Sequence, residues 1–265
     1  MNTPSLDELK LITLDRSDDG AVARITLRGG KGNVLTGDMM RNLRAAFWAL
    51  VGDRNVKTIV IAGEGGHFSF GASVEEHRRE KAAAMIREFH GLILDIARLD
   101  IPIVSAVSGM CLGGAMELVL AGNLIFADET AIFGQPEIQL GVFAPPASVL
   151  LPLRIGYARA EELLITGESI GAERGLEIGI VNRLFATQNA LLEGVDAWIA
   201  RHILPKSASS LRMAVHAERL KMVDTLAEML PRLEYLYTRE LMSTADANEG
   251  IASFLEKRSP HWVNH

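Results

Sequence analysis

The sequence predicts an α/β protein with a helical C-terminal region. Short apolar runs typical of buried strands alternate with segments of helical periodicity as far as about Leu204. This alternation is typical of a sheet whose faces are covered by helices. Beyond Pro205 nearly all of the chain has helical periodicity. We therefore predict an α/β core over residues 1–204 and a helical region over residues 205–265.

The first predicted strand and helix lie on either side of a glycine-rich loop. Residues 21–27 alternate apolar and polar side chains, as a half-buried strand does. The loop at 29–33 follows, and either Thr36 or Asp38 can cap the helix after it. The apolar side of that helix comprises Leu43, Phe47 and Leu50.

The same alternation continues along the core. Short runs rich in β-branched residues predict strands at 56–62, 101–107 and 124–127. Helical patterns occupy residues 75–98, 113–121, 158–165 and 172–179. In the C-terminal region, an apolar stripe on a charged helix must pack against the core or another subunit, and both remain open. Its members are Leu226, Met229, Leu233, Leu236 and Leu241.

Composition restricts the functional class. The chain has 265 residues, a formal charge of −6 and 48% apolar residues, which are ordinary values for a soluble globular protein. Cys111 is the single cysteine, so no intramolecular disulfide can form, and we expect a reducing compartment. The acidic balance argues against nucleic acid as a partner. The first residues lack the apolar stretch of a secretory signal, which favours a cytoplasmic location.

One apolar stretch is long enough to cross a membrane. Residues 101–127 contain a single charged side chain, Glu117. The glycines and serines that interrupt this stretch favour a buried strand, a turn and a buried helix, and a carboxylate within a bilayer would cost about 3 kcal/mol. We therefore expect no membrane span.

The segment from Cys111 to Leu118 carries the first chemical signal. A strand ends, Gly113 and Gly114 turn the chain, and a helix begins. The free N–H groups at such a helix start suit a developing negative charge. Glu117 follows within one turn in apolar surroundings, which should raise the pKa of its carboxyl toward neutrality. The alternative is that the two glycines only form a tight turn between the strand and the helix and have no chemical role.

Two further segments carry candidate groups. Glu137 follows Pro136 in a loop or helix start, and two such carboxylates would make an acid/base pair if they converged. Near residues 67–74, Gly71 supplies a turn and the N–H of Ala72 offers a second backbone donor. His77 is predicted to be a solvated helix residue, and Cys111 a small core residue.

At these three segments the chain resembles the enoyl-CoA hydratase/isomerase (crotonase) superfamily. The resemblance is carried by Gly71-Ala72, by Leu112-Gly113-Gly114 with Glu117, and by Gly134-Gln135-Pro136-Glu137. Segments 68–77 and 140–145 and the tail at 254–258 resemble hydratases that act on a cyclic dienoyl-CoA in anaerobic benzoyl-CoA degradation.

The resemblance implies a spiral of ββα turns with a C-terminal helical trimerisation region, assembled as a trimer or a dimer of trimers. It implies an acyl-CoA thioester substrate, with no metal and no cofactor beyond the coenzyme A of the substrate. By position, Ala72 and Gly114 would form the oxyanion hole, and Glu117 and Glu137 would be the catalytic residues. Which glutamate is base and which is acid stays open.

Two departures from the family pattern concern the substrate pocket. The usual glycine-rich stretch after the second glutamate is replaced by bulkier residues at 142–147, and Ser73 stands where an aspartate is common. We expect Phe68, Phe143 and Pro145 to shape a pocket for a ring. Ser73, Val74 and Lys257, or its neighbour Arg258, are candidate CoA contacts.

Three other functions remain open, one of them other acyl-CoA chemistry such as double-bond isomerisation. The chain could hydrate straight-chain enoyl-CoA, which uses the same two glutamates. It could also be a family member without activity that serves as an interaction or RNA-binding protein, although the acidic balance counts against this.

Overall fold

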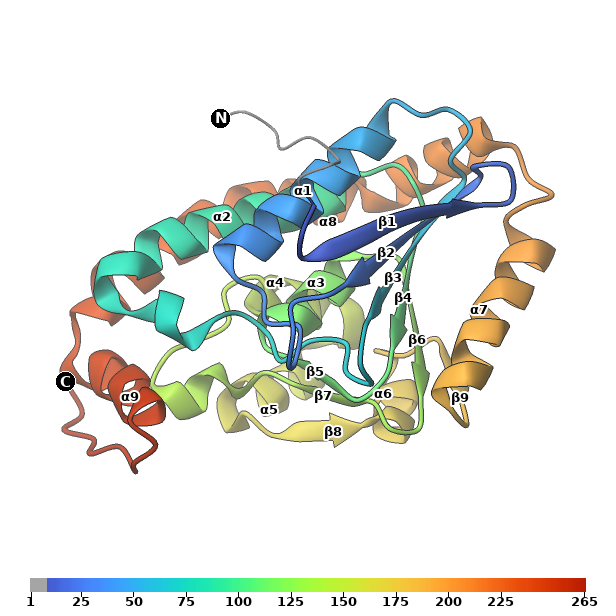
Figure 1. Cartoon of the computed structure of the whole chain (residues 1–265). Coiled ribbons are helices and arrows are strands. Elements are labelled where there is room, and N and C mark those ends of the chain that lie inside the picture. Colours follow the sequence, from blue (N-terminus) through green and yellow to red (C-terminus); the bar gives the residue numbers. More distant parts are fainter. Residues whose placement is uncertain (1–8) are drawn as a thin grey trace.

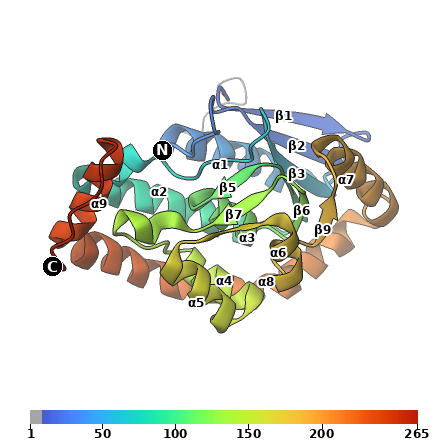
Figure 2. The same ribbon diagram turned by 90° about the horizontal axis from the view of Figure 1, so that it is seen from below.

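The computed structural model describes residues 9–265, which fold as two sheets surrounded by helices (Figures 1 and 2). The larger sheet has the strand order β1-β2-β3-β4-β6-β9 and the smaller one β5-β7-β8. In the larger sheet β1 is antiparallel to β2 and the other pairs are parallel. The strands are β1 (Ile12–Ser17), β2 (Val22–Leu27), β3 (Thr58–Gly63), β4 (Ile103–Val107), β5 (Met110–Leu112), β6 (Leu124–Asp128), β7 (Ile132–Gly134), β8 (Ser169–Gly171) and β9 (Arg183–Phe185).

Helices cover both faces of the larger sheet. In Figure 1, α1, α2 and α8 lie together on one side, whereas α7 lies on the other. The helices are α1 (Gly37–Val51), α2 (Arg79–Arg98), α3 (Gly114–Ala121), α4 (Ala147–Ile155), α5 (Tyr157–Thr166), α6 (Ala172–Ile178), α7 (Gln188–His202), α8 (Ala208–Tyr235) and α9 (Ala245–Leu255). Short helical turns are η2 (Val74–His77), η3 (Pro136–Leu140), the π-helical η4 (Leu236–Glu240) and η5 (Leu241–Ser243).

Alternation along the strands divides the buried side chains between two cores. Ile59 and Ile61 of β3 face the main core with α1, α2 and α3, whereas Val60 faces a smaller core beneath α7. Because successive side chains of a strand point to opposite faces, a sheet covered on both sides needs continuous apolar strands. The α/β fold class predicted from the alternation of strands and helices is confirmed.

Several boundaries of helices and strands agree with those predicted from the local sequence. Thr36 is the N-cap of α1, and its side chain accepts a hydrogen bond from the N–H of Met39 at 3.3 Å. The strand predicted at 21–27 is β2, and the helix predicted at 113–121 is α3. Cys111 is fully buried, so its predicted place in the core is confirmed.

The prediction of one continuous helix over residues 75–98 is wrong, because the helical conformation is interrupted at Arg78. Arg78 is extended (φ −53°, ψ 144°) between η2 and α2. The carbonyl of Ser73 accepts hydrogen bonds from the N–H of Glu76 (3.0 Å) and from Nδ1 of His77 (2.8 Å). These local bonds close a short 3₁₀ turn and separate it from α2.

The C-terminal helices pack on the main core of the same chain. Leu226 is fully buried in this core, and Met229, Leu233 and Leu241 are partly buried and pack against the core. Leu236, by contrast, is 42% exposed. Most of the predicted apolar stripe therefore packs against the core of its own chain and not against another subunit. A separate domain beginning at residue 205 stays a prediction.

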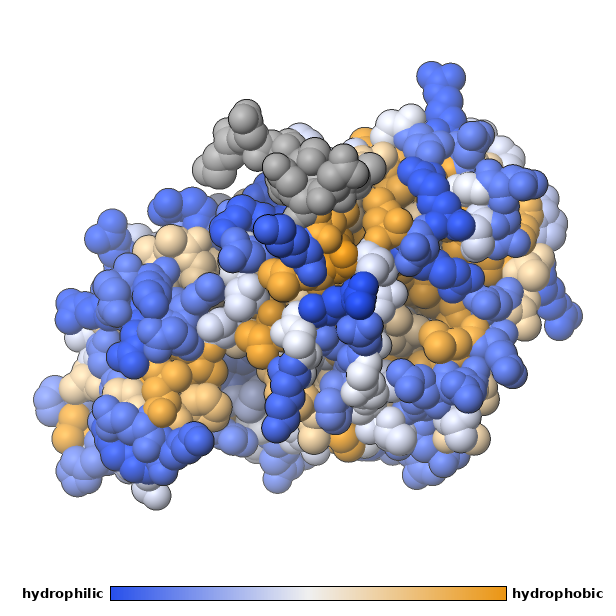
Figure 3. All heavy atoms as spheres, viewed as in Figure 1, coloured by the Kyte–Doolittle hydropathy of each residue, from blue (hydrophilic) through white to orange (hydrophobic). Residues whose placement is uncertain are grey.

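The surface is mixed. On the face shown in Figure 3, hydrophobic areas lie between hydrophilic side chains. Within residues 9–265, no helix combines the length and apolar character that crossing a membrane requires.

Candidate active site

Glu117 lies in the first turn of α3 and is 3% exposed. The N–H of Ala147, at the start of α4, donates a hydrogen bond of 2.8 Å to its Oε1. Burial raises the pKa of the Glu117 carboxyl well above its ordinary value, and the charge of Glu137 raises it further. The predicted direction of this pKa shift is confirmed.

Glu137 reaches the same place from a different part of the chain. Strand β7 pairs in parallel with β5, with Gly134 opposite Leu112, and the N–H of Gly113 donates to the carbonyl of Gly134 at 2.8 Å. The chain then turns through η3, where the carbonyl of Glu137 accepts a hydrogen bond of 3.2 Å from the N–H of Val142. Pairing of the two short strands therefore carries Glu137 to the start of α3.

Gly113 shows how closely the Glu137 carboxylate approaches that helix start. Gly113 has φ +51°, and a Cβ built on it would lie 2.5 Å from Oε1 of Glu137. Only glycine leaves room for the carboxylate here. Because Glu117 lies one turn further along α3, the structure brings the two carboxylates together at one end of this helix.

The two carboxyls lie close enough for the charge of Glu137 to raise the pKa of Glu117. Burial raises the pKa of Glu137 to about 7. Two buried carboxylates that feel each other's charge do not ionise together readily, so near neutral pH the pair holds a proton. A pair that shares a proton in this range can both accept and deliver one.

Gln135 is a polar neighbour that the sequence reasoning missed as a separate contributor. Its side chain is 1% exposed. With the amide nitrogen facing Glu137, it donates to Oε1 at 3.2 Å and to Oε2 at 3.0 Å. The available signal in the sequence was an amide side chain two residues before a candidate carboxylate. Gln135 holds both oxygens of Glu137 in a fixed orientation.

The backbone amides of Ala72 and Gly114 lie side by side. Leu35 forms an isolated parallel β-bridge with Ala72. The N–H of Leu35 donates a hydrogen bond to the carbonyl of Gly71 (2.9 Å), and its carbonyl accepts one from the N–H of Ser73 (3.3 Å). In a parallel bridge the N–H of the intervening Ala72 points the other way. A Cβ built on Gly114 would lie 3.3 Å from the Ala72 nitrogen. The N–H of Gly114 has no intrahelical acceptor because it begins α3.

The predicted pocket residues occupy two places. Phe143 is partly buried and packs against Tyr237, with the ring centroids 5.4 Å apart and the planes tilted by 60°, and Pro145 is buried nearby on the same loop. Phe68 is fully buried in the main core, and its N–H donates to the carbonyl of Ser108 at 2.8 Å. Tyr237 was not anticipated, because nothing in the local sequence distinguishes it from other apolar positions of the C-terminal helix.

The candidate CoA contacts lie near the C-terminal helix. Ser73 and Val74 begin η2, against which α9 packs, and Lys257 is exposed just beyond α9. Arg258 is engaged in ion pairs with Glu249 and Glu256. The prediction that His77 is solvated is wrong: it is partly buried, and burial lowers the pKa of its ring.

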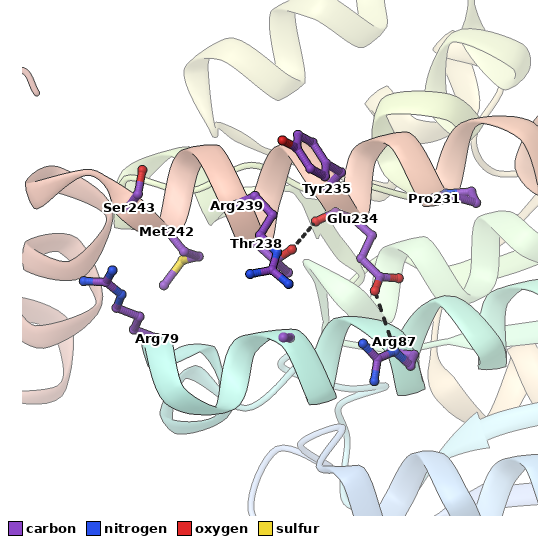
Figure 4. Close-up of a pocket in the computed structure, with 10 residues that line it drawn as sticks. Arg79, Arg87, Pro231, Glu234, Tyr235, Thr238, Arg239, Met242 and Ser243 are labelled. Atoms are coloured by element: carbon purple, nitrogen blue, oxygen red, sulfur yellow. Dashed lines mark hydrogen bonds and ion pairs between the residues drawn. The ribbon is translucent and has the colours of Figure 1, made fainter.

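A separate cleft of about 600 Å³ lies between α2 and the end of α8 (Figure 4). Its lining includes Arg79, Arg239 and Glu234, and Glu234 reaches across to Arg87 of α2 at 3.7 Å. None of the predicted site residues lines this cleft. The candidate site is therefore at the N-terminal end of α3 and not in this outer cleft.

Comparison with known proteins agrees with this geometry. The family model described as enoyl-CoA hydratase/isomerase matches residues 17–265. The chain is 44% identical over 246 residues to a cyclohexa-1,5-dienecarbonyl-CoA hydratase of Thauera aromatica, covering 93% of this chain and 94% of that one. It is 36% identical to a probable enoyl-CoA hydratase of Rhizobium meliloti, covering 93% and 96% of the two chains.

Solved structures show the same fold. An enoyl-CoA hydratase from Mycobacterium avium subsp. paratuberculosis superposes with a TM-score of 0.84 at 26% identity, covering 96% of this chain and 99% of that one. An enoyl-CoA hydratase/isomerase from Xanthobacter autotrophicus gives 0.83 at 27% identity, with 93% of each chain covered. Sequence and structure together show that this chain belongs to the enoyl-CoA hydratase/isomerase family.

Proposed function

We propose that this chain adds water to cyclohexa-1,5-diene-1-carbonyl-CoA and forms 6-hydroxycyclohex-1-ene-1-carbonyl-CoA, a step of anaerobic benzoyl-CoA degradation. As a member of its family the chain is an enzyme, a hydro-lyase. The observation that carries the proposal is the convergence of Glu117 and Glu137 beside two adjacent backbone amides. The name of the Thauera aromatica relative supports the choice of a cyclic substrate.

The amides of Ala72 and Gly114 would bind the thioester oxygen. Polarising this carbonyl makes the conjugated β-carbon electrophilic and stabilises the enolate-like charge that forms when oxygen adds. In other enzymes, removing one donor of an oxyanion hole costs about 3 kcal/mol of transition-state stabilisation.

The two glutamates would handle water and protons. Water lies between the carboxyls and loses a proton to the ionised one as its oxygen bonds to the β-carbon. The protonated carboxyl delivers a proton to the ring carbon at the far end of the diene, and the double bond shifts. Atoms balance with one water added, and the oxidation state does not change, so the reaction as proposed needs no redox cofactor; the two backbone amides polarise the carbonyl, so the proposal includes no metal.

The loop after Glu137 would adapt the pocket to a ring. Val142, Phe143 and Pro145 lie in this loop, and the ring of Phe143 packs against the buried Tyr237. The aromatic ring of Phe143 and the rigid ring of Pro145 suit a six-membered ring better than a mobile alkyl chain. We place Phe68, which is fully buried in the main core, behind the wall of the acyl pocket, and Ser73, Val74 and Lys257 along the CoA moiety.

We further propose that the chain works in the cytoplasm as a homotrimer or a dimer of trimers. Large apolar side chains exposed on α4 and α5 support self-association: Leu153 (50%), Tyr157 (73%) and Ile165 (71%).

The test is incubation of the purified protein with the cyclic dienoyl-CoA, followed by mass detection of product with one added water. Values of kcat/KM are compared with those for crotonyl-CoA, the test substrate for the straight-chain alternative, because the Rhizobium meliloti relative is named a probable enoyl-CoA hydratase. Preference for the cyclic diene supports the proposal. Preference for crotonyl-CoA would replace it with the straight-chain alternative.

A further inference from the structure

Tyr237 occupies an unusual position in the C-terminal helices. It lies in the π-helical segment η4, between α8 and η5, and is 1% exposed. Single π-helical turns are rare and occur frequently at functional sites, because the extra residue redirects a side chain. Here the redirected side chain enters the main core of the protein.

The hydroxyl of Tyr237 has no hydrogen-bond partner among the described residues. Buried tyrosine hydroxyls ordinarily find an acceptor, since leaving one unsatisfied costs about 1–3 kcal/mol. A phenylalanine would fill the same space without this cost. An orphaned hydroxyl therefore points to a partner that is present only when the site is occupied.

Packing places Tyr237 against the loop that holds both glutamates. Its ring packs against that of Phe143, with the centroids 5.4 Å apart and the ring planes tilted by 60°. The residue before Phe143 donates its N–H to the carbonyl of Glu137 (3.2 Å), and the N–H of Ala147 donates to Glu117 (2.8 Å). Tyr237 thus packs on the short segment between the two anchoring bonds.

Electrostatics agree with this placement. Burial is the main cause that raises the pKa of the Tyr237 phenol, followed by the charges of Glu137 and then Glu117. The phenol is therefore neutral across the physiological range and offers one O–H donor near two carboxyls.

We propose that Tyr237 is a third polar residue of this site, donating a hydrogen bond to the oxygen atom that adds to the acyl group. This inference rests on the proposed function, because it places the acceptor first on the water held by the glutamates and then on the hydroxyl of the product. One glutamate takes a proton from that oxygen and the other delivers a proton to the ring, while Tyr237 fixes the position of the oxygen. The phenol then recognises a hydroxylated acyl group, and a deoxy acyl group gives it no acceptor.

The test uses Tyr237→Phe, which removes one oxygen atom and keeps the ring against Phe143. The control is Tyr235→Phe at the end of α8, two residues earlier, where the side chain is 61% exposed. Dissociation constants are measured for 6-hydroxycyclohex-1-ene-1-carbonyl-CoA and for cyclohex-1-ene-1-carbonyl-CoA, which lacks the hydroxyl. We expect Tyr237→Phe to weaken binding of the hydroxylated ligand about 10-fold or more, to leave the deoxy ligand unchanged and to lower kcat. Tyr235→Phe should match the wild type throughout.

Equal binding of the hydroxylated ligand by wild type and Tyr237→Phe would overturn the inference, as would an equal loss for both ligands. The proposed substrate is judged separately, by whether the wild type hydrates the cyclic diene. If it prefers crotonyl-CoA, the same comparison is made with 3-hydroxybutanoyl-CoA and butanoyl-CoA. A selective loss for the hydroxylated ligand of that pair would uphold the role of Tyr237 while the cyclic substrate is rejected.

Discussion

The N–H of Ala147 donates a 2.8 Å hydrogen bond to Oε1 of Glu117 and so joins the start of α4 to the first turn of α3. The free N–H groups at a helix start favour a negative charge, so this bond orients the carboxylate and partly offsets the cost of burying it. Burial nevertheless dominates, and the pKa of Glu117 remains raised. The carboxyl is thereby held in place and kept easy to protonate.

Removal of either carboxyl should abolish most of the turnover. For Glu117→Gln and Glu137→Gln we expect kcat to fall about 10²- to 10⁴-fold, the usual contribution of a positioned acid or base. Steady-state hydration kinetics measure this, with circular dichroism to verify the fold. Glu161→Gln, an exposed carboxylate on α5, serves as the control. Turnover close to wild type in either site variant would remove that residue from the mechanism.

How much of this site the sequence predicts depends on the range of the interactions involved. The helix start at Gly114 and the isolated charge of Glu117 follow from local pattern, and so does the N-cap at Thr36. The meeting of Glu117 with Glu137 depends on the pairing of β5 with β7, two strands of three residues each. Strands this short carry almost no periodicity, so their pairing is set by tertiary packing.

Tyr237 illustrates the same limit in a helix. A π-helical turn shifts the register of every later side chain, and an ordinary 3.6-residue pattern does not reveal it. Leu236, which belongs to the predicted apolar stripe but is exposed at the start of η4, reflects this change of register.

Stability should fall as pH rises through the range in which the glutamate pair ionises. The pKa of Glu137 is raised from 4.5 to about 7, so between these pH values the folded state binds more protons than the unfolded chain. The free energy of unfolding therefore decreases with increasing pH, by at most about 1.4 kcal/mol per pH unit for this group. Glu137→Gln removes this dependence, so its Tm relative to wild type should rise from pH 4.5 to pH 8. A difference in Tm that stays constant with pH would contradict the raised pKa.

Gly113→Ala should damage activity through Glu137. The added Cβ would lie 2.5 Å from Oε1 of Glu137, which forces the carboxylate away from α3. Displacing a catalytic group by about 1 Å can cost about 10²-fold, and we expect a loss in kcat of that order. The control is Gly156→Ala, because Gly156 also has a positive φ (+78°) but has no atom near its added Cβ.

Both glycine variants should lose about 1 kcal/mol or more of stability from backbone strain, measured by denaturant unfolding. Only Gly113→Ala should lose activity in addition. An equal loss of activity in the two variants would mean that backbone strain, and not contact with Glu137, is responsible.

His90→Phe should protect the protein against mild acid. His90 is 4% exposed in α2, and neither ring nitrogen has a hydrogen-bond partner among the described residues; its nearest carboxylate oxygen, on Glu234, is 3.8 Å from Nδ1. Burial lowers the pKa of His90 from 6.5 to about 4, so between these values the unfolded chain binds more protons and stability falls with falling pH. Phenylalanine fills similar space and does not titrate. The Tm difference, variant minus wild type, should therefore be larger at pH 5 than at pH 8, where the histidine is neutral in both states. Equal differences at the two pH values would show that His90 is not buried in its neutral form.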